Sequence, residues 1–192
     1  DDLGVKELGV KKWEKEISAL NNQAQVVLRT NTLKIDRLSL QSKLEDEEVE
    51  TTINDSYPDA LILDERKNVF RTDAFKKGWF EVQDAFSQLV AQYLDVKPGM
   101  IVVDCCVGAG GKTLYLSALM QNKGKLIAMD IYESKLKKLK IRAKRNGAHN
   151  IIINVIESTK PIKKLHKIAD RVLIDAPCWG LGVLKRNPDS KW

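Results

Sequence analysis

Residues 101–113, Ile-Val-Val-Asp-Cys-Cys-Val-Gly-Ala-Gly-Gly-Lys-Thr, constrain the fold of this 192-residue chain more than any other stretch. The three β-branched residues at 101–103 predict a buried parallel strand, and Asp104 closes it. The glycine-rich turn that follows opens into a helix expected to start near Thr113. In an open α/β sheet, ligands bind at the carboxyl ends of the strands, where backbone N–H groups and a helix N-terminus converge. The stretch therefore predicts a nucleotide-type binding loop.

The pattern of a strand that ends on an acidic residue recurs through the second half of the chain. Further strands are expected at 125–129, 151–156 and 171–174, closing on Asp130, Glu157 and Asp175. Helices are expected at 113–121 and 133–146. Strands alternating with helices predict an α/β domain with a doubly wound parallel sheet, whose acidic residues surround one crevice.

The first part of the chain predicts a smaller α+β domain. An amphipathic helix is expected within residues 5–20, a strand at 25–30, a helix after it, and short extended segments at 49–53, 60–63 and 68–71. An amphipathic helix over residues 85–94, with Phe86 and Tyr93 on its apolar face, then leads into the second domain. We expect an N-terminal helix and linker at 1–24, a small α+β domain at 25–75 and the larger domain at 76–192.

The spacing of the loop glycines narrows the choice of ligand. An ATP-binding P-loop requires glycine five residues before Gly111, where this chain has Cys106. The dinucleotide fingerprint fails as well, because Thr113 stands where its third glycine belongs. A nucleoside without a pyrophosphate remains, and S-adenosylmethionine is the commonest such ligand. Asp130 would accept hydrogen bonds from its ribose, Glu157 would lie near the adenine, and Asp104 would line the floor of the pocket.

A second stretch with chemical potential is Asp175-Ala-Pro-Cys-Trp-Gly-Leu-Gly at residues 175–182. Cys178 follows the carboxyl end of a strand, on a loop that faces the same crevice. A buried cysteine that packs as a small hydrophobic residue is the weaker alternative. We expect a Cys178 thiolate to attack an electron-poor ring carbon, while Asp175 supplies or holds a proton on the ring.

Composition excludes several classes of protein. No apolar run of 18 residues occurs and the N-terminus is acidic, so a soluble intracellular protein without a membrane partner is expected. The three cysteines form no C-x-x-C motif, and His149 and His166 have no partner at ligand spacing, so no metal site is expected. The net charge of +6 and pI near 9.1 fit a polyanionic partner but also an ordinary protein. Residues 125–150, with eight basic and two acidic residues, predict either an RNA-binding face or a merely solvated one.

Taken together, the motifs resemble the NSUN-like (Sun-type) RNA cytosine-5 methyltransferases. The matching residues run from Arg29-Thr-Asn-Thr-Leu-Lys34, through Gly78–Asp84, the Cys-x-x-x-Gly-Gly-Lys-Thr loop and Asp130-Ile131, to Asp175-Ala-Pro-Cys-x-Gly-x-Gly-Val and Arg186-Asn-Pro-Asp-x-x-Trp192. The resemblance implies a Rossmann-like S-adenosylmethionine-dependent methyltransferase sheet preceded by an RNA-recognition-like domain, and ribosomal or transfer RNA as substrate. It also implies that the cofactor is bound by Cys106, Val107, Gly108, Ala109, Gly110, Gly111, Lys112, Asp130, Glu157 and Asp175.

The chemistry implied by the resemblance is covalent. A cysteine adds to C6 of cytosine, C5 takes the methyl group, and loss of the C5 proton releases the product. In the resembling family the nucleophile lies in a later Thr-Cys motif and the Pro-Cys cysteine, here Cys178, assists release. In related DNA methylases the Pro-Cys cysteine is itself the nucleophile, so Cys178 has two candidate roles.

The chain departs from the family pattern in four places. Val107-Gly108-Ala109 replaces Ala-Ala-Pro or Ala-Gly-Pro, Glu157 replaces an aspartate, and Trp179 replaces a small residue beside Cys178. The sequence also ends at Trp192, before the Thr-Cys motif and before the strands of a full seven-stranded sheet. We therefore expect a sheet truncated after its fourth strand, in an incompletely represented enzyme. If the 192 residues were the whole protein, we would expect it to bind the cofactor without efficient turnover.

Two other functions remain open. The chain could be a non-catalytic RNA-binding or assembly module that retains the methyltransferase fold. Methyl transfer to a protein or a small molecule is disfavoured by the stretch that contains Cys178. We expect a cytoplasmic location in a bacterium or archaeon, and a nucleolar or nuclear one in a eukaryote.

Overall fold

A computed structural model describes residues 2–176, which divide into two compact units, residues 2–25 and residues 26–176. The first unit contains two helices, α1 (Asp2–Leu8) and α2 (Val10–Asn21). The two helices pack on each other, and a Cβ added at Gly4 would lie 2.3 Å from the indole of Trp13. The helix predicted within residues 5–20 corresponds to α2, but residues 5–8 belong to α1, because Gly9 adopts a φ of 75° that interrupts the helical backbone.

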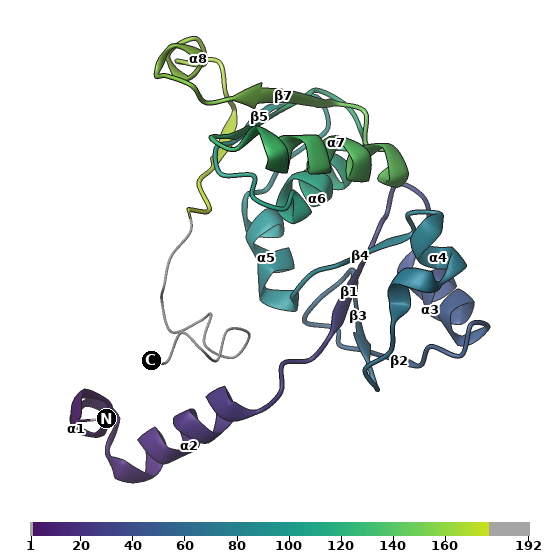
Figure 1. Cartoon of the computed structure of the whole chain (residues 1–192), viewed down its shortest axis with the longest axis vertical. Helices are drawn as coiled ribbons and strands as arrows, with labels where there is room; N and C mark the ends of the chain where they lie inside the picture. Colours follow the sequence, from purple (N-terminus) through teal and green to yellow (C-terminus); the bar gives the residue numbers. More distant parts are fainter. Residues whose placement is uncertain (1, 177–192) are drawn as a thin grey trace. The chain divides into compact units, whose positions relative to one another are not determined.

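The second unit contains two sheets with their helices (Figure 1). The first sheet and the elements around it are β1 (Val27–Thr30), α3 (Arg37–Glu45), β2 (Thr51–Ile53), β3 (Ala60–Leu63), the 3-10 helix η1 (Val69–Arg71), α4 (Asp73–Lys76) and β4 (Phe80–Val82). The second sheet and its surroundings are α5 (Ala85–Tyr93), β5 (Ile101–Asp104), α6 (Gly111–Leu119), β6 (Lys125–Asp130), α7 (Glu133–Asn146), β7 (Ile151–Val155), α8 (Lys160–Lys163) and β8 (Arg171–Leu173).

The first sheet is antiparallel, with the strand order β2-β3-β1-β4. Its core is apolar: Leu28 from β1 and Phe80 from β4 pack with Leu40 and Leu44 of α3, all with no exposed surface. The capping carboxylate of Asp36 starts α3 by accepting the N–H of Ser39 at 2.9 Å.

Two features of this first sheet differ from the sequence-based expectation. The predicted extended segment at 68–71 is wrong, because the Asn68 side chain accepts the N–H of Phe70 and caps a 3-10 turn. Residues 80–82, which lie beyond the predicted domain range of 25–75, add the edge strand β4 beside β1. The division at residue 75 stays a prediction, but the first sheet draws on residues from both sides of it.

The second sheet is parallel, as predicted, with the strand order β7-β6-β5-β8. Helices α5, α6 and α7 cover one face, where Val102 and Leu126 are fully buried (Figure 1). The other face packs Val103 against Leu165, from the segment that follows α8. Among the described residues β8 is an edge strand, and its Val172 is 47% exposed. The predicted α/β architecture is therefore confirmed.

Helix α7 spans the predicted residues 133–146 and buries Leu136, Leu139 and Ala143 against the sheet. It ends at Gly147, whose φ of 72° suits a glycine at a helix C-terminus. In α5 the predicted apolar face is wrong in part, because Phe86 and Tyr93 are 70% and 85% exposed, whereas Ala85 of the same predicted face is buried. No helix within residues 2–176 is long and apolar enough to cross a membrane.

The packing of α7 gives a stability prediction with a matched control. We expect Leu139→Ala to lower the free energy of unfolding by about 2–5 kcal/mol, because Leu139 is fully buried and its removal leaves a cavity. Ile141→Ala, on the same helix but 73% exposed, should change it by less than about 0.5 kcal/mol. Urea unfolding measures both, and equal losses would contradict the assigned helix face.

Candidate functional site

Four acidic residues lie in a row where the strands of the second sheet end. Following the strand order β7-β6-β5-β8, these are Glu157, Asp130, Asp104 and Asp175. Their burial differs, because Asp104 and Asp130 are buried, whereas Glu157 and Asp175 are exposed. The parallel sheet thus brings together carboxylates from residues up to 71 positions apart in the sequence.

The glycine-rich loop between β5 and α6 is held by Asp130 at the end of β6. Asp130 Oδ2 accepts the backbone N–H of Gly108 at 2.9 Å, and Oδ1 accepts that of Tyr132 at 2.9 Å. The N–H of Val107 adds a backbone hydrogen bond to the carbonyl of Met129 at 3.2 Å. Asp130 therefore positions the loop, and its Oδ2 also lies 3.9 Å from the Nζ of Lys135. Because a carboxylate oxygen can accept more than one hydrogen bond, Asp130 can still accept from a ligand.

Asp104 ties together the two ends of the same loop. Its Oδ2 accepts the hydroxyl of Thr113 at 2.7 Å, and its Oδ1 accepts the backbone N–H of Cys106 at 3.3 Å. Burial raises the pKa of the Asp104 carboxyl above its ordinary value, and the two hydrogen bonds oppose that rise. Asp104 thus stabilises the start of α6 from beneath the loop.

Asp175 reaches the loop from the other side through Lys112. The Lys112 Nζ lies 2.6 Å from Asp175 Oδ2. This ion pair connects the first turn of α6 to the segment just after β8. The Lys112 side chain is 18% exposed and that of Asp175 is 49% exposed. This ion pair brings two of the predicted cofactor-binding residues together at the open side of the loop.

The loop backbone needs glycine at Gly110. Its φ is 82°, and an added Cβ would lie 2.6 Å from Leu139 Cδ1 of α7. Gly108 also has a positive φ, of 55°, but an added Cβ there meets only the Cys106 carbonyl oxygen at 3.9 Å. Gly110 therefore packs the loop onto α7, while Gly108 leaves open space at its tip.

The two described cysteines are not activated nucleophiles. Burial raises the pKa of the Cys106 thiol, and the nearby carboxylate of Asp104 raises it further. Burial raises the pKa of the Cys105 thiol as well. Both thiols are therefore protonated at neutral pH. Cys178, the predicted catalytic cysteine, lies outside the described residues.

Glu157 shares the strand edge with the other three acidic residues but is exposed. The backbone next to it is fixed, because the N–H of Ile156 donates to the carbonyl of Asp130 at 3.0 Å.

Within residues 2–176 no group of three His, Cys, Asp or Glu side chains could hold a metal ion.

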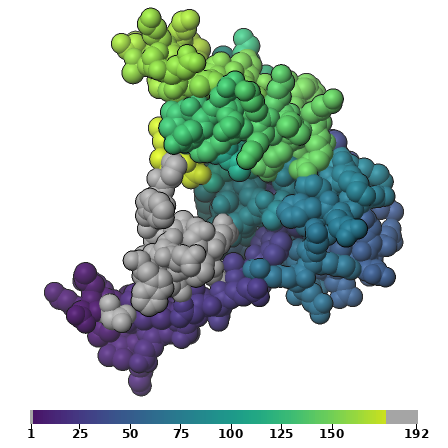
Figure 2. Space-filling model, in the orientation of Figure 1, coloured from purple at the N-terminus to yellow at the C-terminus, as the bar shows by residue number. Residues whose placement is uncertain are grey.

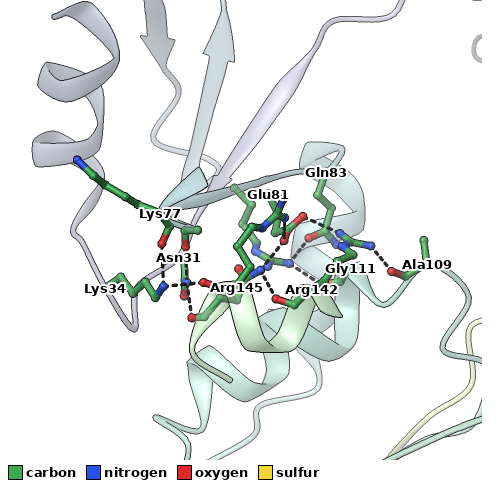
Figure 3. A network of polar contacts seen from close by, with 12 residues as sticks. Asn31, Lys34, Lys77, Glu81, Gln83, Ala109, Gly111, Arg142 and Arg145 are labelled. Carbon is green, nitrogen blue, oxygen red and sulfur yellow. Dashed lines mark hydrogen bonds and ion pairs between the residues drawn. The ribbon is translucent and has the colours of Figure 1, made fainter. Parts of the chain in front are cut away.

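Sequence reasoning missed a set of residues behind the loop (Figure 3). Arg29 of β1 is 1% exposed and donates from one nitrogen to the side-chain oxygen of Gln83 and to the carbonyl of Gly111. Arg142 of α7 donates to the carbonyl of Ala109 and, at 2.7 Å, to Glu81 of β4. The one signal that could have revealed them is the arginine in the apolar stretch Val26-Val27-Leu28-Arg29, since a buried charge requires a partner.

Glu81 is the centre of this set. It is 3% exposed and accepts hydrogen bonds from Arg142, Arg145 and, at 2.5 Å, the side chain of Asn146. Burial alone would raise the pKa of Glu81, but these donors hold it below its ordinary value. The carboxylate is therefore ionised and fully partnered at neutral pH.

Family models match both parts of the chain. The model described as 16S rRNA methyltransferase RsmB/F matches residues 91–192, more than half of the chain. The model described as the RsmF/B-like ferredoxin-like domain matches residues 5–70.

Individual proteins agree with the family models. The chain is 34% identical over 186 residues to "Probable ribosomal RNA small subunit methyltransferase B" of Synechocystis sp., covering 96% of this chain and 42% of that protein. It is 32% identical over 182 residues to "Ribosomal RNA small subunit methyltransferase B" of Vibrio vulnificus, covering 94% and 42%. The crystal structure of a methyltransferase homologue from Pyrococcus horikoshii superposes with a TM-score of 0.83 at 30% identity, covering 93% of this chain and 58% of that one. The chain thus spans less than half the length of the curated relatives it matches.

The hydrogen bonds from Thr113 and Cys106 to the buried Asp104 predict that the stability of the protein depends on pH. Thr113→Val removes the hydroxyl that donates to Asp104, so the pKa of Asp104 in the folded state moves further above its unfolded value. A group with a raised folded-state pKa costs stability as the pH rises through that pKa. We expect a loss of about 1–3 kcal/mol near neutral pH that shrinks toward about pH 4.

Urea unfolding at the two pH values measures this loss. Thr52→Val is the control, because it removes an exposed hydroxyl bonded to Asp64 and should cost less at both. A loss for Thr113→Val that does not change with pH would show that Asp104 is not the group involved.

Proposed function

Because the chain belongs to the RsmB/F family of 16S rRNA methyltransferases, we propose that it methylates small-subunit ribosomal RNA with S-adenosylmethionine as the methyl donor. The observation that carries the proposal is the row of four carboxylates at the strand ends, set around a glycine loop that a buried aspartate holds open. The relatives that bear this name come from bacteria, and on that ground we also propose a cytoplasmic location.

The loop residues suit a nucleoside cofactor. We propose that residues 106–112 hold S-adenosylmethionine with Asp130 accepting from the ribose, Glu157 beside the adenine and Asp175 next to Lys112. Three features fit this assignment: the remaining acceptor capacity of the Asp130 carboxylate, an open loop tip at Gly108, and exposed carboxylates on either side. When bound, the cofactor supplies an electrophilic methyl group.

We further propose that the methyl group goes to C5 of cytosine. The stretch Asp175-Ala-Pro-Cys178 supports this, since a thiolate that adds to C6 makes C5 nucleophilic. After methyl transfer, loss of the C5 proton and elimination of the thiolate restore the ring. Cys178 would act either as this nucleophile or in the release step, and Asp175 would hold a proton on the base.

An RNA-binding role fits the outer surface of α7, which contributes to the green region of Figure 2. Its exposed basic residues are Lys137, Lys138, Lys140 and Lys144. Arg142 and Arg145 of the same helix instead pair with the buried Glu81, so they are not free for phosphates. The basic face proposed for RNA is therefore made of lysines, of which Lys137 pairs with the exposed Glu133 at 3.1 Å.

The proposed activity is tested with a form of the protein that includes the Thr-Cys motif, incubated with unmodified 16S ribosomal RNA and S-adenosylmethionine that carries a labelled methyl group. We expect label in 5-methylcytosine, identified by mass spectrometry of the digested nucleosides. Label in another nucleoside would contradict the cytosine proposal. Cofactor binding without any transfer to RNA would favour a non-catalytic module.

Replacing Cys178 separates its two roles. If Cys178 assists release, Cys178→Ala in the protein that includes the Thr-Cys motif should accumulate a protein–RNA adduct that survives denaturation, because elimination is blocked. If it is the nucleophile, both the adduct and the methylation should be lost. Cys105→Ala is the matched control, since Cys105 is described and has a protonated thiol, and it should leave both readouts intact.

A further inference from the structure

The loop proposed to bind the cofactor is held from behind by two arginines. Arg142 donates to the carbonyl of Ala109, and Arg29 donates to the carbonyl of Gly111, on either side of Gly110 (Figure 3). In a trans peptide the C=O and the following N–H point in opposite directions. Fixing these two carbonyls therefore also fixes the N–H groups of Gly110 and Lys112.

Both arginines are anchored on the first sheet. Arg29 lies in β1 and pairs in register with Glu81 of β4. Its guanidinium also lies 4.8 Å from the centre of the Tyr115 ring and bonds to Gln83, which follows β4. Arg142 lies in α7, but its second nitrogen is bound to Glu81 at 2.7 Å.

The charge of Arg29 is retained despite its burial. Burial lowers the pKa of Arg29 to about 10, so the guanidinium is protonated at neutral pH. A buried cation of this kind is stable only while its partners stay in place. The Gly111 carbonyl is one of those partners, which couples the position of the loop to the first sheet.

We infer that Arg29 and Glu81 are positioning residues for the cofactor loop, Arg29 through the Gly111 carbonyl and Glu81 through Arg142 and the Ala109 carbonyl. Neither belongs to the residues predicted to contact the cofactor. The affinity for S-adenosylmethionine thus depends on a sheet outside the methyltransferase fold. The inference rests on the proposed function, in which residues 106–112 bind that cofactor.

The chain offers a matched pair of variants. Arg142 and Arg145 lie on the same helix and both pair with Glu81, but only Arg142 also donates to the loop. Arg142→Gln removes the loop contact together with the ion pair, whereas Arg145→Gln removes an ion pair and no loop contact. Their side chains are 25% and 22% exposed. Arg145→Gln also removes the stacking of Arg145 on the Phe75 ring, at 3.8 Å, so it disturbs the surroundings of Glu81 without touching the loop.

Calorimetry with S-adenosylmethionine and hydrogen exchange of the free protein are the two readouts. We expect Arg142→Gln to weaken cofactor binding about tenfold and to speed exchange of the loop amides, while Arg145→Gln changes affinity less than about twofold.

Glu81→Gln should weaken binding as well. The double variant Glu81→Gln/Arg142→Gln should bind no more weakly than Arg142→Gln alone, because Glu81 acts on the loop through Arg142. Arg29→Met should weaken binding independently of Arg142, since it acts on a different carbonyl.

Two outcomes would overturn the inference, and a third concerns the proposed function. Equal affinities for Arg142→Gln and Arg145→Gln would show that the Arg142 contact with the loop does not affect cofactor binding. Fully additive effects of Glu81→Gln and Arg142→Gln would show that Glu81 does not act through Arg142. If the parent chain does not bind S-adenosylmethionine, the cofactor proposal fails. In that case, equal loop exchange in Arg142→Gln and Arg145→Gln would overturn the positioning role, and faster exchange in the former alone would support it.

Discussion

The site depends on buried carboxylates that accept backbone N–H groups from the glycine loop. Asp130 binds the N–H of Gly108, and Asp104 binds the N–H of Cys106 together with the hydroxyl of Thr113. Apart from the buried side chain of Val107, the loop has few side chains to fix its shape, so polar contacts supply much of the constraint. Because both aspartates end neighbouring parallel strands, the sheet itself sets where the loop can lie.

The first sheet adds a second set of constraints from the opposite side. Glu81 is buried, so water cannot stabilise its charge and the carboxylate needs cationic partners. Its ion pairs with Arg142 and Arg145 connect α7 to β4. Asn31 strengthens the same junction by donating to the carbonyls of Gly78 and Asn146, at 2.7 and 2.8 Å. The small domain is therefore part of the support for the loop as well as a candidate RNA-binding element.

The sequence predicted the features that depend on local signals. Helix α7 and its end at Gly147 follow from apolar spacing and a glycine with positive φ, and the parallel sheet follows from apolar runs that close on acidic residues. It missed β4, because three residues after a turn carry too short a pattern. It also missed the partners of Arg29, because Gln83 and Gly111 lie 54 and 82 positions away and only the fold brings them together. The exposure of Phe86 is equally non-local, since a helix buries whichever face its neighbours cover.

The central claim is that the loop at residues 106–112 and the strand-end aspartates form an S-adenosylmethionine site. A crystal structure of the protein with S-adenosylmethionine tests it most directly. The account predicts the ribose hydroxyls within about 3.2 Å of an Asp130 carboxylate oxygen, with the loop backbone in contact with the ligand. A nucleoside bound elsewhere, with Asp130 still contacting only Gly108, Tyr132 and Lys135, would contradict it.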